Sequence, residues 1–225
     1  MSEAVATHDT HGHGHAGHDA HGHGKPKTHP DEFGSATGGK IAMWIFLLSD
    51  AMSFGGLLLG YAIIRSRQPN WPNPVKYLGI NFTAGMTFLL ICSSVSMVMA
   101  LAAAHERNRK QTLMWLGFTI LGGLMFLGGQ VYEYTHLHHS GMSLSGTALA
   151  ARDGIPPAFA STFFVITGFH GCHVTAGVIY LITIFIRTAM GKYDDNANPI
   201  ELCGLFWHFV DLVWILVFTF VYLIP

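Results

Sequence analysis

Charged residues are scarce in this chain of 225 residues. Asp, Glu, Lys and Arg together make up 11% of it, the formal net charge is −1, and Lys and Arg form no cluster. This pattern excludes a nucleic-acid-binding surface, which depends on clustered basic residues. Half of the residues are hydrophobic, and with so few charges such a composition indicates a membrane protein rather than a soluble domain.

Cysteine is also rare. Cys92, Cys172 and Cys203 lie in or beside apolar segments and have no short paired spacing. Isolated thiols of this kind predict packing residues rather than disulfides or a thiolate metal site.

Five apolar segments are long enough to cross a bilayer, which takes about 20 helical residues. Polar, Pro-containing or Gly/Ser-rich stretches separate them, and every apolar run has the length of a helix rather than a strand. The predicted fold class is therefore an all-α integral membrane protein. We expect a bundle of five transmembrane helices, with spans near 41–64, 79–104, 112–136, 158–186 and 203–224.

Lys and Arg are divided unevenly between the two ends of these spans. If the N-terminus is cytoplasmic, that side holds eight of the twelve, and the other side holds Arg65, Arg67, Lys76 and Arg152. Because cytoplasmic loops are richer in Lys and Arg, we expect a cytoplasmic N-terminus and a C-terminus outside.

Residues 1–39 have a different composition. They contain eight of the fifteen histidines, with Gly, Ala and Asp between them and no apolar run. Such a segment can neither form a core nor act as a secretory signal peptide. We therefore expect a disordered, cytoplasmic His-rich tail before a transmembrane domain at 40–225. Its histidines, with His11, His13 and His15 as the first candidates, either bind a metal ion or belong to a plain solvated tail.

Ionisable side chains inside apolar spans are candidate functional residues, because each costs roughly 2.5–3.5 kcal/mol at the membrane centre. Asp50 lies about nine residues, or ~14 Å, into the first span. The sequence allows two roles for Asp50, a proton relay or a structural hydrogen bond. Glu133 lies nearer the outer end of the third span, where we expect it to be easily hydrated and to contact a lipid head group or a partner.

The last two spans hold the other intramembrane ionisable residues. His170 and His173 share one helical face, as do His208 and Asp211. Together they could in principle supply three histidines and one carboxylate to a metal ion. The favoured interpretation is hydrogen bonding between helices or to lipid head groups. We expect the neighbouring Trp207 in the core or against lipid rather than against a cofactor.

Three stretches carry a family resemblance: GKIAMWIFLLSD at 39–50, STFFVITGFHGCHV at 161–174 and WHFVDLVW at 207–214. In this order they resemble signature stretches of subunit III of the haem-copper terminal oxidases, and the resemblance covers residues 39–224. The five spans look like the short form of the family, which occurs in bacterial quinol oxidases and in many bacterial cytochrome c oxidases. Where the mitochondrial-type subunit has a buried glutamate, this chain has Asp50. Quinol-oxidase-type members also have an aspartate there.

The resemblance implies a subunit with no catalytic residue, haem or copper of its own, the haem and copper being held by partner subunits. Such a subunit packs on subunit I, where oxygen is reduced and protons are pumped, in a complex with subunit II in the bacterial plasma membrane. It binds phospholipid in a cleft between its helices and supports proton uptake and enzyme stability. Asp50 is then the candidate for proton uptake. The candidates for lipid binding or polar contacts between helices are Glu133, His170, His173, Trp207, His208 and Asp211. The electron donor, cytochrome c or quinol, stays open.

Three other interpretations compete with this one. The His-rich tail and the intramembrane His and Asp residues suggest a metal-ion transporter, but five spans cannot divide into equal halves and no internal repeat is visible. A haem-ligating membrane anchor would use His170 or His208. The related subunit of a nitric oxide reductase is the nearest alternative.

Overall fold

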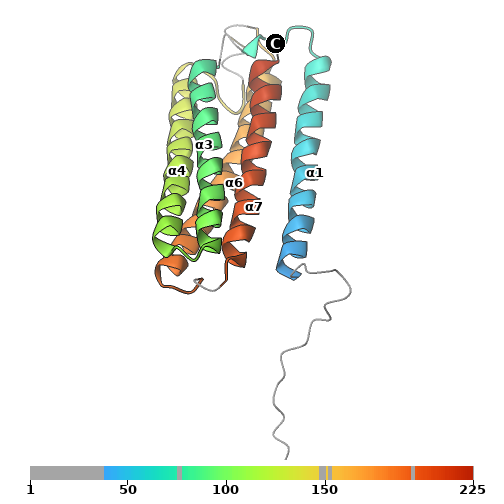
Figure 1. Cartoon of the computed structure of the whole chain (residues 1–225). Helices are drawn as coiled ribbons and strands as arrows, with labels where there is room; N and C mark the ends of the chain where they lie inside the picture. The colour runs from blue at the N-terminus through green and yellow to red at the C-terminus, as the bar shows by residue number, and fades with distance from the viewer. Residues whose placement is uncertain (1–37, 75–77, 147–150, 152–153, 194–195, 225) are drawn as a thin grey trace, which may run out of the picture. The chain divides into compact units, whose positions relative to one another are not determined.

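A computed structural model of the protein describes residues 38–74, 78–146, 151, 154–193 and 196–224. Its elements are α1 (Gly38–Ser66), α3 (Ile80–His105), α4 (Arg109–His139), α6 (Pro157–Ala189) and α7 (Asn198–Val217), which a π-helix, η1 (Phe218–Leu223), continues (Figure 1). Within these residues, five helices are long and apolar enough to cross a membrane, which confirms the predicted fold class. Of the His-rich tail predicted at 1–39, only Gly38 and Gly39, which begin α1, lie within the described residues.

Local sequence signals explain where the helices begin. The side chain of Asn108 caps α4 by accepting a hydrogen bond from the backbone N–H of Gln111 at 3.3 Å. Pro157 begins α6, a position where the missing N–H of proline costs nothing. α7 begins at Asn198 rather than at 203, because Pro199 starts the helix while the next residues are still partly polar.

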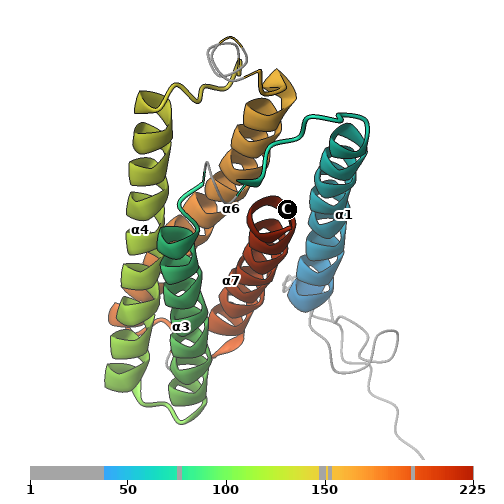
Figure 2. The same ribbon diagram turned by 90° about the horizontal axis from the view of Figure 1, so that it is seen from above.

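α7 has contacts with most of the other helices. It packs against α1, α3 and α6, while α3 pairs with α4 and α4 packs against α6. Successive helices run antiparallel, so that α1, α4 and α7 begin at the same end (Figure 1). α1 lies beside α7 and α6, on the side away from α4 (Figure 2). This placement leaves much of α1 exposed.

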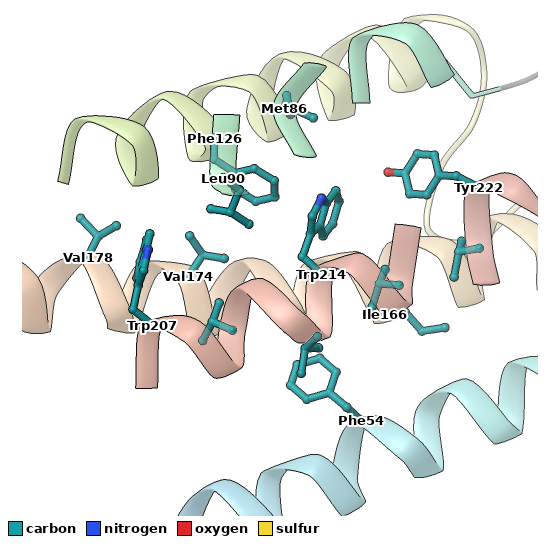
Figure 3. Close-up of a cluster of buried hydrophobic side chains, with 14 of the residues drawn as sticks. Phe54, Met86, Leu90, Phe126, Ile166, Val174, Val178, Trp207, Trp214 and Tyr222 are labelled. Atoms are coloured by element: carbon teal, nitrogen blue, oxygen red, sulfur yellow. The ribbon is translucent and has the colours of Figure 1, made fainter. Parts of the chain in front are cut away.

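Two tryptophans of α7 lie in the centre of the core. Trp207 and Trp214 are 1% and 0% exposed, and Phe126 of α4 packs edge-on against Trp214 at 4.8 Å between ring centroids (Figure 3). Each indole N–H donates to a hydroxyl of α3, Trp207 to Ser93 at 3.2 Å and Trp214 to Thr87 at 2.9 Å. Hydrogen bonds between transmembrane helices are worth about 0.6 kcal/mol on average. These two therefore set the register of α7 on α3 more than they add stability.

The three cysteines are free thiols in different surroundings. Cys203 is buried, whereas Cys92 and Cys172 are exposed on the outer faces of their helices. The predicted packing role is therefore wrong for Cys92 and Cys172, because helix rotation turns both away from the core.

Candidate functional site

The first polar site joins α1 to α6. Oδ1 of Asp50 lies 3.2 Å from Nε2 of His173, with the two side chains 10% and 18% exposed. Nδ1 of His173 lies 2.8 Å from the carbonyl oxygen of Phe169, one turn earlier. The rings of Phe54 and Phe169 flank the imidazole, with centroids 5.1 and 4.7 Å away. Asp50 and His173, predicted as separate candidates, thus form one pair.

The hydrogen bonds of His173 restrict where protons can lie. A carbonyl oxygen only accepts, so Nδ1 facing Phe169 carries a proton. Nε2 and Oδ1 of Asp50 then share one further proton, as an imidazolium beside a carboxylate or as a neutral imidazole beside a carboxylic acid. Both forms are neutral overall, which suits a pair inside a membrane span.

Two largely apolar grooves flank α1. A groove of about 350 Å³ lies between α1 and α7, and its walls include Trp44, Leu48, Ala51, Leu205 and His208. A second groove of about 270 Å³ lies between α1 and α6, where Gly56 and Gly60 face Thr162 and Val165. Apart from the imidazole of His208, the first groove is lined by apolar side chains, so it suits a hydrocarbon chain.

His170 does not join the Asp50–His173 pair, although it lies one turn away. It is 0% exposed, and its ring packs against Trp214, Phe126 and Phe54 with centroids 4.9, 5.9 and 6.3 Å away. Neither ring nitrogen has a hydrogen bond within the described residues. His170 is therefore an aromatic-enclosed core residue, and the hydrogen bond between helices expected of it is not formed.

His208 and Asp211 face α3. Nδ1 of His208 lies 2.6 Å from the hydroxyl oxygen of Ser94, while the ring also lines the groove beside α1. Asp211 is 7% exposed, and its Oδ1 has no hydrogen bond within the described ranges. This polar contact joins α3 to α7.

The four-residue metal site that the sequence allowed is not assembled. His173 faces α1, His170 faces aromatic rings and His208 faces α3. Nowhere in the described part of the chain do three His, Cys, Asp or Glu side chains come together as metal ligands. His11, His13 and His15 lie outside the described residues.

Glu133 forms a second buried carboxylate site, between α4, α3 and η1. Its Oε1 accepts a hydrogen bond from the hydroxyl of Thr83 at 3.0 Å, and its Oε2 accepts one from Tyr222 at 3.2 Å. Glu133 is only 5% exposed. The prediction that its side chain is easily hydrated is therefore wrong. η1 places Tyr222 over this carboxylate, and π-helical turns often mark functional positions.

Sequence reasoning missed the hydroxyl groups that hold the bundle together. Five of them lie on the buried side of α3 and bond to α4, α7 or their own helix: Thr83, Thr87, Ser93, Ser94 and Ser96. The spacings of four residues between Thr83 and Thr87 and of three between Ser93 and Ser96, within one apolar span, are the signal that could have identified them.

A second missed network joins α4 to α6. Gln130 donates to the Thr167 carbonyl oxygen at 2.7 Å and to the Tyr134 hydroxyl at 3.3 Å, and the hydroxyls of Tyr134 and Thr167 are 2.7 Å apart. Gly171 lies directly against the Gln130 carboxamide. A side chain at this position would have to displace the carboxamide.

Known proteins resemble the chain over almost all of the described residues. The family model "Cytochrome c oxidase subunit III" matches residues 28–224. The "Probable cytochrome c oxidase subunit 3" of Nocardia farcinica is 35% identical over 182 residues, 80% of this chain and 85% of the relative. The "Quinol oxidase subunit 3" of Bacillus spizizenii is 34% identical, over 86% of this chain and 92% of the relative. The "Cytochrome bo(3) ubiquinol oxidase subunit 3" of Pseudomonas aeruginosa is 31% identical, over 87% and 90%.

Proposed function

The chain belongs to the cytochrome c oxidase subunit III family of the haem-copper oxidases, and from this premise we propose that it binds phospholipid beside α1 and supports proton uptake and stability of the oxidase. The observation that carries the proposal is the Asp50–His173 pair, at 3.2 Å within the span. It is a titratable site in a chain whose described residues bring no metal-ligand set together.

The proton role follows from the arrangement of the pair. One proton lies between Oδ1 of Asp50 and Nε2 of His173, and the Phe169 carbonyl holds the ring in the orientation that presents Nε2. Its loss would leave a carboxylate facing a lone pair inside the span. Nearby titratable side chains on the helices packed against α1 are His170 on α6 and His208 on α7. A proton held here can be passed to the oxygen-reducing subunit.

The lipid role rests on the grooves beside α1. Their walls are almost wholly apolar, and they open on both sides of α1, which packs mainly on α6 and α7 within the described residues. Acyl chains in these grooves would bury Trp44, Leu48 and the glycine face of α1. In water, the burial of one CH₂ group contributes about 0.8 kcal/mol. Inside the bilayer, the gain comes instead from close packing.

The proposed partners are subunits I and II of a terminal oxidase, which hold the haem and copper. Relatives are named for both cytochrome c and quinol oxidases, so the donor is not assigned. We place the chain in a bacterial plasma membrane, with the N-terminus cytoplasmic. This orientation is supported by the eight Lys and Arg residues on that side against four on the other.

Deleting the gene and restoring it on a plasmid tests this function. We expect the oxidase without this chain to start at nearly normal rates and then to inactivate faster during turnover, with less phospholipid bound per complex. The chain purified alone is expected to have no haem band in a reduced-minus-oxidised spectrum. A stoichiometric haem band in the isolated chain would contradict the proposal.

A further inference from the structure

A pocket of about 410 Å³ lies at the end of the bundle that contains the start of α3 and the end of α4. Its walls include Gly79 and Phe82 from the α3 side and Tyr132, Glu133, His136 and Ser140 from the α4 side. Unlike the grooves beside α1, it combines aromatic rings with a carboxylate, an imidazole and a hydroxyl. No function described above uses it.

Within the described residues, the carboxylate of Glu133 has hydrogen-bond donors but no positively charged partner. Its two oxygens lie within hydrogen-bond distance of the hydroxyls of Thr83 and Tyr222, and the two oxygens of an ionised carboxylate have about four lone-pair sites for donors. Among the described residues, the ion pairs are Lys40–Glu201 and Asp50–His173, and neither involves Glu133. Buried charges in proteins are normally paired. Glu133 therefore has room for a cation on the side that faces the pocket.

Aromatic rings form the wall next to this carboxylate. Tyr132 is 61% exposed, and its ring lies 5.4 Å from that of Phe82 and is stacked on His136 at 6.3 Å between centroids. The faces of such rings attract ammonium groups within about 6 Å. Among the described residues, no Lys or Arg lines the pocket, so this wall favours a cation over an anion.

The depth of the pocket matches that of lipid head groups. α4 ends at His139, six residues after Glu133, which is about 9 Å along a helix. α3 begins at Ile80, three residues before Thr83. Tyrosines are enriched at this level of a membrane, where polar head groups meet the hydrocarbon.

We propose that this pocket binds the primary ammonium group of a phospholipid head group, with Glu133 accepting its N–H bonds and the Tyr132 ring against its face. The inference rests on the proposed phospholipid-binding function and specifies its chemistry at a separate place. A primary ammonium donates hydrogen bonds and a quaternary one does not, so ethanolamine is preferred to choline. The imidazole of His136 is placed to donate to the phosphate.

Binding of short-chain phospholipids to the intact oxidase, measured by native mass spectrometry, tests the proposal. The probes carry ethanolamine, choline or glycerol head groups on the same acyl chains. We expect the parent complex to bind the ethanolamine lipid about tenfold more tightly than the choline lipid, a difference of about 1.4 kcal/mol. Glu133→Gln should remove this preference while leaving choline and glycerol binding unchanged.

Glu106→Gln is the matched control, because it makes the same carboxylate-to-amide change at an exposed residue at the opposite end of the bundle. It should bind all three lipids like the parent. Tyr132→Leu changes an exposed residue and is expected to assemble, so it keeps the proposal testable if Glu133→Gln does not. Its ethanolamine preference should fall about threefold, as loss of a cation–π contact predicts.

Several results would overturn the proposal. Equal affinities of the parent for ethanolamine and choline lipids would do so, as would an unchanged preference in either pocket variant. If free ethanolamine competed for the pocket as strongly as the ethanolamine lipid does, the ligand would be a soluble amine rather than a lipid. If head-group preference is absent while acyl chains remain bound beside α1, the pocket proposal alone fails. If no lipid binds anywhere, the proposed lipid function fails as well.

Discussion

Lys40 of α1 and Glu201 of α7 form an ion pair, with 2.8 Å between Nζ and Oε2. At the opposite end, the guanidinium of Arg65 donates to the carbonyl oxygen of Ile224 at 3.1 Å. α1 is therefore attached to the C-terminal helix at both ends, and to α6 midway through Asp50. A partly exposed ion pair is worth at most about 1 kcal/mol. The stability of α1 in its position then depends on what fills the grooves beside it.

Filling the groove between α1 and α7 should displace lipid. Ala51 lines this groove, and Ala51→Phe places a ring where an acyl chain would lie. We expect fewer phospholipids per purified complex, counted by mass spectrometry, and faster loss of activity during turnover. Ala62→Phe is the control, because Ala62 is exposed on α1 but lines neither groove. Unchanged lipid content in Ala51→Phe would argue against the lipid role of this groove.

Removing the shared proton should produce a defect confined to alkaline pH. In Asp50→Asn, the amide N–H can donate to neutral Nε2 of His173, so the contact and assembly are retained without a titratable proton. We expect oxygen consumption to be normal at neutral pH and to fall at alkaline pH, where protons are scarce. The loss should be smaller than the roughly 10²-fold that removing a catalytic acid or base costs, because the pair only supports the catalytic subunit.

The comparison for Asp50→Asn is Glu106→Gln, which removes an exposed carboxylate just beyond the end of α3, away from the pair. Its pH profile should match that of the parent. Identical profiles for parent and a fully assembled Asp50→Asn complex would leave Asp50 with a structural role only.

Adding a methyl group at Gly171 should destabilise the contact between α4 and α6. A Cβ there would lie 2.8 Å from Oε1 and 2.9 Å from Nε2 of Gln130, which is itself bonded to the Thr167 carbonyl. Overpacking of this kind costs about 1–3 kcal/mol. We expect a lower unfolding temperature for Gly171→Ala in the purified complex. Gly128→Ala, where a Cβ meets nothing within 4 Å, should leave it unchanged or slightly higher.

Removing residues 2–36 should leave assembly and steady-state activity nearly unchanged. The segment has no apolar run, and the contacts of α1 with the bundle begin beyond it, at Lys40. Oxidase content and oxygen consumption of membranes from the truncated strain give the measurement. Loss of the complex would mean that the tail assists assembly or delivers a metal ion.

The helices could be predicted closely, whereas the relations between their polar side chains could not. Apolar length predicted a third span at 112–136, and α4 indeed covers it. Spacing placed His170 and His173 on one face of α6, yet one ring packs among aromatic side chains and the other meets Asp50. α1 and α7 pack on adjacent parts of that face, and helical periodicity within one segment cannot indicate which neighbour each part meets.

Glu133 shows the same limit in another form. Its place near the end of a span predicted contact with water, because helix ends usually reach the membrane surface. In the structure, Thr83 from α3 and Tyr222 from η1 cover it. Tyr222 is 89 residues away in the sequence, so local patterns contain no sign of this contact.

The sequence by itself determined the number of spans and their approximate limits, because bilayer thickness and the cost of unpaired backbone groups in hydrocarbon allow an apolar run few alternatives to a helix. Its motifs also determined the family. Only the tertiary structure decided that Asp50 pairs with His173, that His170 is enclosed by rings and that Glu133 borders a pocket. The physical reason is that these contacts depend on the rotation and neighbours of each helix, which side chains distant in the sequence set together through packing.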